Sequence, residues 1–150
     1  MRLINGRLAA VALAGLFVVT WRAPIDQDVV AQTRKPVMVT RIYTGPDGQA
    51  RSELVEMKLN GGNTDMIKAT GVQFSSRPAG PVSEWHTGPA RQYVITLSGR
   101  AELEIGDGKK VAIGPGQINL IEDTTGKGHT TRNIEDRIVV TIPLADQTTR

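Results

Sequence analysis

Two histidines are the residues of this sequence best suited to chemistry. His86 stands a few residues before the run QYVITL (92–97), which is typical of a strand, and His129 follows a Gly-rich stretch. The chain has no cysteine, which excludes disulfides, thiolate catalysis and thiolate metal sites. An imidazole can accept a proton or bind a transition metal, and either role requires other polar groups beside it. The elements that carry the two histidines must therefore bring such groups together.

Those elements are short strands separated by turns. Strict alternation in AELEI (101–105) puts apolar residues on one face and glutamates on the other, as a half-buried antiparallel strand requires. No segment from residue 37 onward has the length and period of a helix longer than a turn or two. The sequence therefore predicts an all-β, closed or two-sheet architecture. The predicted strands are 37–43, 53–59, 72–76, 92–97, 101–105, 111–113, 118–121 and 136–142.

Composition and charge fit one folded domain that does not bind nucleic acid. The chain has 150 residues, of which 39% are hydrophobic and 22% charged, which is ordinary for a globular protein. Its formal net charge is +3, and the Lys and Arg residues are scattered without any run. A basic patch for a nucleic acid is therefore not indicated.

The N-terminal segment has the pattern of an export signal. Arg2 and Arg7 precede an apolar run at 8–21, which is shorter than the roughly 20 residues of a membrane span. We expect residues 1–31 to be cleaved, leaving one domain, 32–150, in the periplasm or secreted, with no stable membrane anchor. The alternative is an uncleaved N-terminal anchor, and in both cases the folded part lies outside the cytoplasm.

The region around His86 resembles the first motif of the cupin family, G-x5-H-x-H-x3/4-E-x6-G. Gly80, His86, Gln92 and Gly99 stand at the spacing of that motif. Two positions depart from it: Gly88 replaces the second histidine, and Gln92 replaces the glutamate.

The region around His129 resembles the second cupin motif, G-x5-P-x-G-x2-H-x3-N. Gly116, Gly126, His129 and Asn133 match it, while Thr124 replaces the proline and the preceding loop is longer. The segments WHTGPARQ and EDTTGKGH are similar to the corresponding segments of small single-domain cupins without a defined reaction. The resemblance implies an antiparallel jelly-roll β-barrel, and a homodimer that pairs through its outer sheets.

The resemblance also implies a metal site inside the barrel. Cupin motif residues bind one divalent transition metal, and the matching positions here are His86, Gln92 and His129. Two imidazoles and a neutral amide form an incomplete site for Fe, Mn, Ni, Zn or Cu. Glu84 lies two residues before His86, hence on the same strand face, and could supply the missing carboxylate.

Further residues are expected at the rim of the same pocket. Phe74 and Arg77 approach it from VQFSSRPAG, and the guanidinium of Arg77 would suit a carboxylate substrate. Thr131 shares a strand face with His129. The pair Glu122 and Asp123 is predicted to be a solvated turn rather than a general acid and base.

The sequence leaves three interpretations of this pocket open. In the first, an exported small cupin uses an incomplete transition-metal site, with or without enzymatic activity. In the second, a metal-free periplasmic module binds a carbohydrate or a small organic acid. In the third, the histidines only form hydrogen bonds within the barrel.

Overall fold

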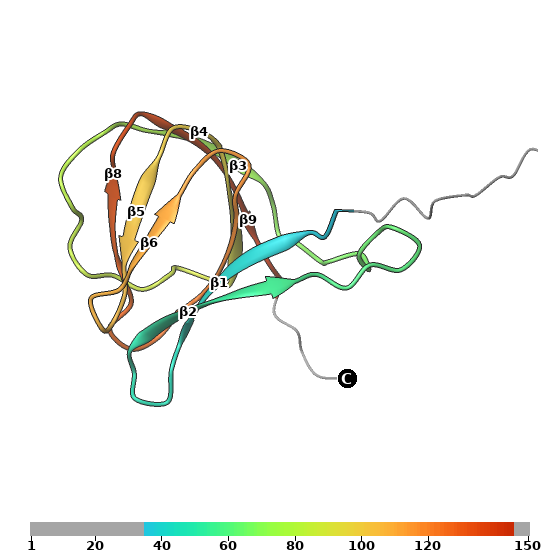
Figure 1. Ribbon diagram of the computed structural model, residues 1–150, viewed down its shortest axis with the longest axis horizontal. Coiled ribbons are helices and arrows are strands. Elements are labelled where there is room, and N and C mark those ends of the chain that lie inside the picture. Colours follow the sequence, from blue (N-terminus) through green and yellow to red (C-terminus); the bar gives the residue numbers. More distant parts are fainter. Residues whose placement is uncertain (1–34, 146–150) are drawn as a thin grey trace, which may run out of the picture. The chain divides into compact units, whose positions relative to one another are not determined.

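A computed structural model describes residues 35–145, and every regular element in them is a strand (Figure 1). The predicted export signal, residues 1–31, lies outside this range. No helix in the described range is long and apolar enough to cross a membrane. The strands are β1 (Met38–Thr44), β2 (Ala50–Glu56), β3 (Gln73–Arg77), β4 (Gln92–Ser98), β5 (Ala101–Glu104), β6 (Lys110–Ile113), β7 (Ile118–Glu122), β8 (Thr130–Asn133) and β9 (Arg137–Pro143).

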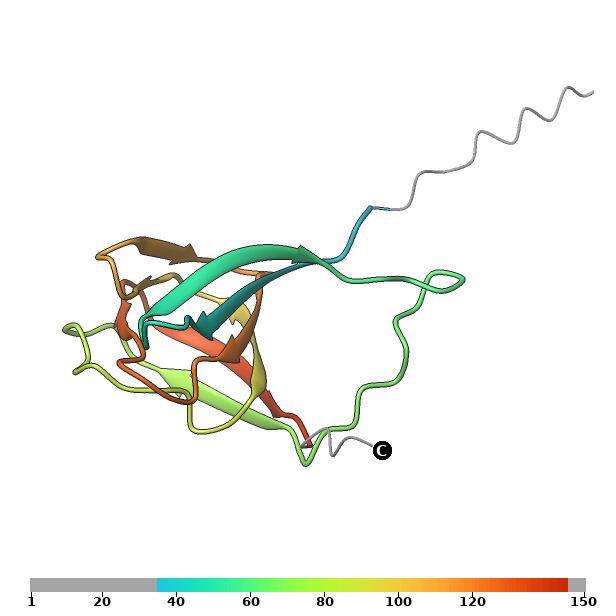
Figure 2. The ribbon, with the colours of Figure 1, turned by 90° about the horizontal axis from the view of Figure 1, so that it is seen from below.

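The strands form two sheets with the topology of a jelly roll. The larger sheet has the order β2-β1-β7-β4-β9-β3, and the smaller one has the order β6-β5-β8. Every pairing between these strands is antiparallel except that of β1 with β7, which is parallel. The two sheets face each other, and residues 57–72 extend away from them (Figure 2). The predicted all-β jelly-roll class is confirmed.

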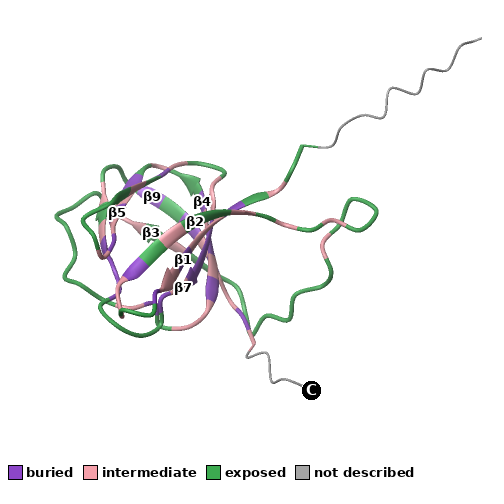
Figure 3. Cartoon of the chain, turned by 60° about the horizontal axis from the view of Figure 1, so that its bottom comes forward, coloured by how far each residue is buried: buried purple, intermediate pink, exposed green. Residues whose placement is uncertain are grey.

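The space between the sheets is filled by alternate residues of each strand. In β4 the buried positions are Gln92, Val94 and Thr96, and the residues between them point to the other face of the sheet. A second apolar cluster covers that other face, around Val39 and Leu120. Most of the buried residues lie in the strands, whereas loop 57–72 is largely exposed (Figure 3). The inner core consists of Ile42, Ala50, Val94, Ala101, Leu103, Ile105, Ile113, Ile121 and Val139.

The small sheet is extended by the segment that carries His86. The backbone N–H of Gly80 donates to Asn133 at 3.1 Å, and that of Ser83 donates to Thr131 at 2.9 Å. The N–H of His86 donates to the carbonyl of His129 at 3.0 Å, and the reverse bond is 2.9 Å. Residues 80–86 therefore run along the free edge of β8 and satisfy its backbone groups.

Two strands of the structure differ from the predicted list. β2 begins at Ala50, whereas the apolar alternation predicted a start at residue 53. β8 was expected only as the strand face shared by Thr131 and His129, without bounds, because its sequence TTRN has no apolar alternation. It becomes a strand through pairing with β5 on one side and residues 80–86 on the other.

Glu122 is not a solvated turn residue, because it accepts charged hydrogen bonds from two arginines. The Nε atoms of Arg41 and Arg91 each donate to it at 2.5 Å. Burial alone would raise the pKa of Glu122, but the hydrogen bonds from Arg91 and Arg41 outweigh it, and the pKa lies below its usual 4.5. The side chain thus ties β7 to β1 and to the start of β4.

We expect Glu122→Gln to lower the free energy of unfolding by about 1 kcal/mol at pH 7, since both arginines are partly exposed. A carboxyl with a depressed pKa stabilises the fold above its unfolded value and loses that effect as the pH falls through the folded value. The difference in free energy of unfolding between the wild type and the variant should therefore shrink as the pH falls. Urea titrations across pH 7 to 3 would measure it. Glu135→Gln, in an exposed pair with Arg100, is the control and should cost less. A deficit that grows on acidification would contradict this assignment.

Candidate functional site

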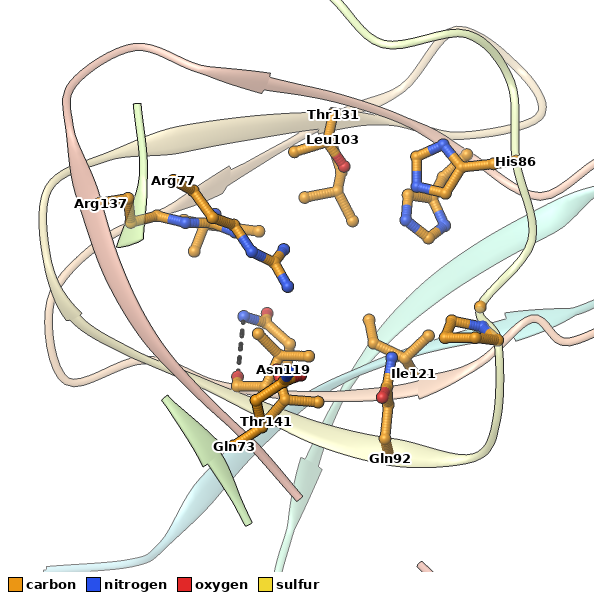
Figure 4. A pocket seen from close by; sticks show the side chains of 15 residues that line it. Gln73, Arg77, His86, Gln92, Leu103, Asn119, Ile121, Thr131, Arg137 and Thr141 are labelled. Atoms are coloured by element: carbon orange, nitrogen blue, oxygen red, sulfur yellow. Dashed lines mark hydrogen bonds between the residues drawn. The ribbon is translucent and has the colours of Figure 1, made fainter. Parts of the chain in front are cut away.

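A cavity of about 200 Å³ lies between the two sheets. Figure 4 shows Arg77 and Arg137 at one end and His86 at the other, with Asn119, Thr141 and Gln73 on the side of the large sheet. Its lining is mostly polar, which is unusual for the space between packed sheets. The lining residues are Gln73, Arg77, His86, Gly88, Pro89, Gln92, Val94, Leu103, Ile113, Asn119, Ile121, His129, Thr131, Arg137 and Thr141.

The two histidines lie side by side in the cavity wall. Their ring centroids are 4.6 Å apart with the planes tilted by 58°. His86 is exposed at the mouth, whereas His129 is only 6% exposed. The two backbone hydrogen bonds between residues 86 and 129 hold both rings on the same wall.

Asp123 orients the ring of His129. Its Oδ2 lies 2.5 Å from Nδ1 of His129, and both side chains are buried. The other oxygen, Oδ1, has no hydrogen-bond partner. A carboxylate can only accept, so Nδ1 carries a proton and Nε2 of a neutral His129 is left as an acceptor.

His86 has the same tautomer for a different reason. Its Nδ1 lies 2.9 Å from the carbonyl oxygen of Glu84, which can only accept, so Nδ1 carries the proton here too. Next to it, Trp85 is 37% exposed, and Nζ of Lys127 stands 3.8 Å from its ring centroid. This cation–π contact anchors the segment 84–86 to the loop before His129.

Gly128 permits the close approach of the two histidine segments. Its φ is +71°, and an added Cβ would lie 2.0 Å from the carbonyl oxygen of His86. Any other residue would therefore force the two strands apart as well as strain the backbone.

Gly88, at the position of the second motif histidine, has no room for a side chain. A Cβ there would meet Cγ2 of Ile121 at 2.5 Å. The side chain of Ile121 thus fills the space in which a further ligand would stand.

Arg77 and Arg137 form a pair of like charges directly opposite each other on β3 and β9. Arg137 is 2% exposed, and its Nε and Nη1 have no hydrogen-bond partner. In residues 35–145 neither guanidinium forms an ion pair. Burial lowers the pKa of Arg77, while burial and the charge of Arg77 lower the pKa of Arg137 to about 10. Both remain cationic at neutral pH.

A row of polar side chains crosses the large sheet beside the arginines. Backbone register places Gln73 opposite Thr141, Thr141 opposite Val94, and Val94 opposite Asn119. Oγ1 of Thr141 and Oδ1 of Asn119 are buried without a partner, while Nδ2 of Asn119 donates to the carbonyl of Val94 at 3.5 Å. Buried polar groups are normally hydrogen-bonded, so these two oxygen atoms are notable for having no partner within the protein.

The structure brings together most of the site residues predicted from sequence. His86, Gln92, His129, Arg77 and Thr131 all line the cavity.

Two predicted residues lie elsewhere. Phe74 is 71% exposed, because its neighbours in β3, Gln73 and Ser75, face inward and alternation turns it out. The side chain of Glu84 is exposed and absent from the lining, so it adds no carboxylate.

Sequence reasoning missed Asp123, Arg137, Asn119 and Thr141. Asp123 is fully buried, which contradicts its interpretation as a solvated turn residue. Alternation in β9 could have identified Arg137, since it shares a face with Val139 and Thr141.

The residues present do not fit the transition-metal site that the cupin resemblance implies. Both imidazoles are held by a hydrogen bond from Nδ1, which leaves Nε2 free and would suit metal ligands. The set of donors does not fit, because the cavity is lined by two imidazoles and by no carboxylate, and the amides of Gln73, Gln92 and Asn119 are neutral. Among residues 35–145 no three His, Cys, Asp or Glu side chains gather closely enough to hold an ion.

Comparisons with known proteins give only distant structural likenesses. No protein-family model matches the chain, and no curated protein sequence matches it significantly. The conserved protein SPY1581 of Streptococcus pyogenes, of unknown function, is 21% identical over 54% of this chain and 69% of its own, with a TM-score of 0.41. Protein NMB1881 of Neisseria meningitidis is 22% identical over 53% and 79%, with a TM-score of 0.41. A Salmonella typhimurium protein named ethanolamine utilization protein Q is 14% identical over 76% and 99%, with a TM-score of 0.40.

We predict that Gly128→Ala destabilises the protein far more than Gly108→Ala. Both glycines have positive φ, +71° and +78°, but a Cβ at Gly108 meets nothing within 4 Å. Backbone strain alone should lower the free energy of unfolding of the control, Gly108→Ala, by about 1 kcal/mol. The additional collision with His86 should bring the loss in Gly128→Ala to about 3 kcal/mol. Urea unfolding of both variants measures the difference. Equal losses would show that the approach of the two segments is not tightly constrained.

Proposed function

We propose that this chain is a small cupin-type protein whose cavity binds a small organic acid without a metal. The observation that carries the proposal is the pair of guanidinium groups, Arg77 and Arg137, which face each other in the cavity without a carboxylate partner.

The protein's own charges around the cavity are unfavourable, which supports an anionic ligand. Like charges directly opposite on neighbouring strands destabilise a sheet, and a buried charge without a partner is costly. An anion between Arg77 and Arg137 would relieve both costs. Guanidinium groups form charge-assisted hydrogen bonds with carboxylates, and Nε and Nη1 of Arg137 have no such partner within the protein.

The size and lining of the cavity narrow the class of ligand. Its volume of about 200 Å³ is below the roughly 300 to 1,000 Å³ of sites for drug-sized ligands. Asn119 and Thr141 offer free oxygen atoms, and Gln73 and Gln92 offer amides, to hydroxyl or carbonyl groups of the ligand. A short-chain oxo or hydroxy acid, or an acid derived from a sugar, combines these features. Export and a homodimer stay predictions.

Isothermal titration calorimetry with 2-oxoglutarate, malate, gluconate, inorganic phosphate and glucose tests the proposal. We expect one or more of the organic acids to bind and neutral glucose not to bind. Arg77→Gln should weaken that binding at least about tenfold, since it removes a charge-assisted hydrogen bond. Arg132→Gln on the outward face of β8 removes the same charge and should have little effect. Binding of no acid, or binding that Arg77→Gln leaves intact, would overturn the proposal.

Removing the buried charge should stabilise the ligand-free protein. We expect Arg137→Met to raise the free energy of unfolding by about 1 kcal/mol or more, because an apolar side chain of similar length replaces an unpaired buried charge. The same variant should lose acid binding. Urea unfolding measures the first effect, and Arg132→Met, as the exposed control, should change stability by less than about 0.5 kcal/mol. A large loss of stability in Arg137→Met would mean that its guanidinium is already satisfied in the free protein.

A further inference from the structure

The buried pair of Asp123 and His129 has a geometry that acid binding does not require. A neutral side chain would be enough to fill the space, yet the chain buries a carboxylate at 0% exposure against the imidazole. Burying a carboxylate is costly, and one of its oxygens has no partner here. This arrangement fixes the ring orientation, keeps Nε2 as an acceptor, and stabilises the imidazolium that forms when Nε2 takes a proton.

The cavity joins this base to a site for negative charge. His129 lines the same cavity as Arg77 and Arg137, and no lining residue carries a carboxylate. A negative charge that develops on a bound molecule would therefore be stabilised by fixed cations in a partly desolvated space. Gln92, a buried residue that lies toward the His86 end of the cavity in Figure 4, offers its amide N–H₂ group to the same molecule.

We propose that the cavity catalyses proton transfer at carbon, with His129 as the general base, Asp123 as its positioning residue, and an enolisable oxo acid as the substrate. The proposal rests on the acid-binding function given above. It names an oxo acid because a C–H bond becomes acidic enough for an imidazole only beside a carbonyl group.

The step balances without any co-reactant. Nε2 of His129 takes the proton from the carbon next to the carbonyl, and the electron pair of the C–H bond forms a carbon–carbon double bond. The π electrons of the carbonyl move to its oxygen, giving an enolate that the arginines stabilise. The Nε2 proton of the imidazolium exchanges with water while the enolate is bound. Return of this solvent-derived proton to carbon restores the oxo acid, with a solvent hydrogen in place of the original one.

Exchange of carbon-bound hydrogen in D₂O tests the proposal directly. Proton NMR follows the loss of the C-3 signal of pyruvate and of 2-oxoglutarate with the full-length protein present. We expect exchange of at least one of them at least about tenfold faster than in buffer. His129→Gln and Asp123→Asn should each lower the catalysed rate about 100-fold, a typical share for a general base, while calorimetric affinity for the acid stays within a few fold. Asp107→Asn, in an exposed turn, is the control and should leave the rate unchanged.

A tautomer measurement separates positioning from a merely structural role. In Asp123→Asn the amide can donate to Nδ1, so His129 should carry its proton on Nε2 instead, and nitrogen-15 spectra distinguish the two forms. An unchanged tautomer together with an unchanged rate would overturn the role of Asp123. Thermal melting shows whether each variant is folded, and His129→Gln keeps the test decisive if Asp123→Asn does not fold.

The remaining outcomes each have one meaning. An oxo acid that binds but does not exchange faster than in His129→Gln overturns the catalytic proposal and leaves the binding function intact. Failure of both oxo acids to bind, while malate or gluconate binds, overturns the substrate class. Failure of every acid to bind overturns the proposed function itself. If a chelator abolishes the exchange and a divalent metal restores it, the reaction depends on a metal and the general-base proposal is overturned. Exchange that is insensitive to the chelator supports the proposal.

Discussion

The backbone contact between residues 86 and 129 is the constraint on which the rest of the site depends. Two hydrogen bonds of 3.0 and 2.9 Å join the segments, and the absence of a side chain at Gly128 allows them to come so close. The contact extends the small sheet beyond β8 and puts both imidazoles on one wall of the cavity. Without it, His86 would belong to a surface loop, and His129 would face the cavity alone.

The interior between the sheets is divided into two regions with opposite energetics. Around Ile42 and Ile105 the side chains are apolar and fully buried, and they supply the hydrophobic stabilisation of the fold. Around Arg137 and Asn119 the interior keeps polar atoms without partners, which lowers stability. Proteins retain buried polar atoms without hydrogen-bond partners mainly at functional sites. The apolar region therefore keeps the small domain folded, while the polar region forms the cavity proposed to bind an acid.

The sequence predicted the elements that carry a clear local pattern better than those that do not. Apolar alternation predicted β5 and β9 to within a residue, and the motif spacing predicted that His86, Gln92 and His129 would meet. The bounds of β8 were not predicted, because a polar strand has no apolar alternation to detect. Asp123 was misinterpreted because a carboxylate beside glycines has the pattern of a surface turn, and only its partner His129 reveals that it is buried.

The sequence by itself determined most of the strand segments and, within the apolar ones, which side chains share a face, because side-chain direction alternates with a fixed period along a strand. It therefore identified two histidines, an amide and Arg77 as site candidates. Only the tertiary structure decided that Arg77 stands opposite Arg137, that Ile121 fills the space beside Gly88, and that Phe74 points outward. These facts depend on which distant strands pair and in which register. That choice is made by the packing of the whole domain, and no local pattern records it.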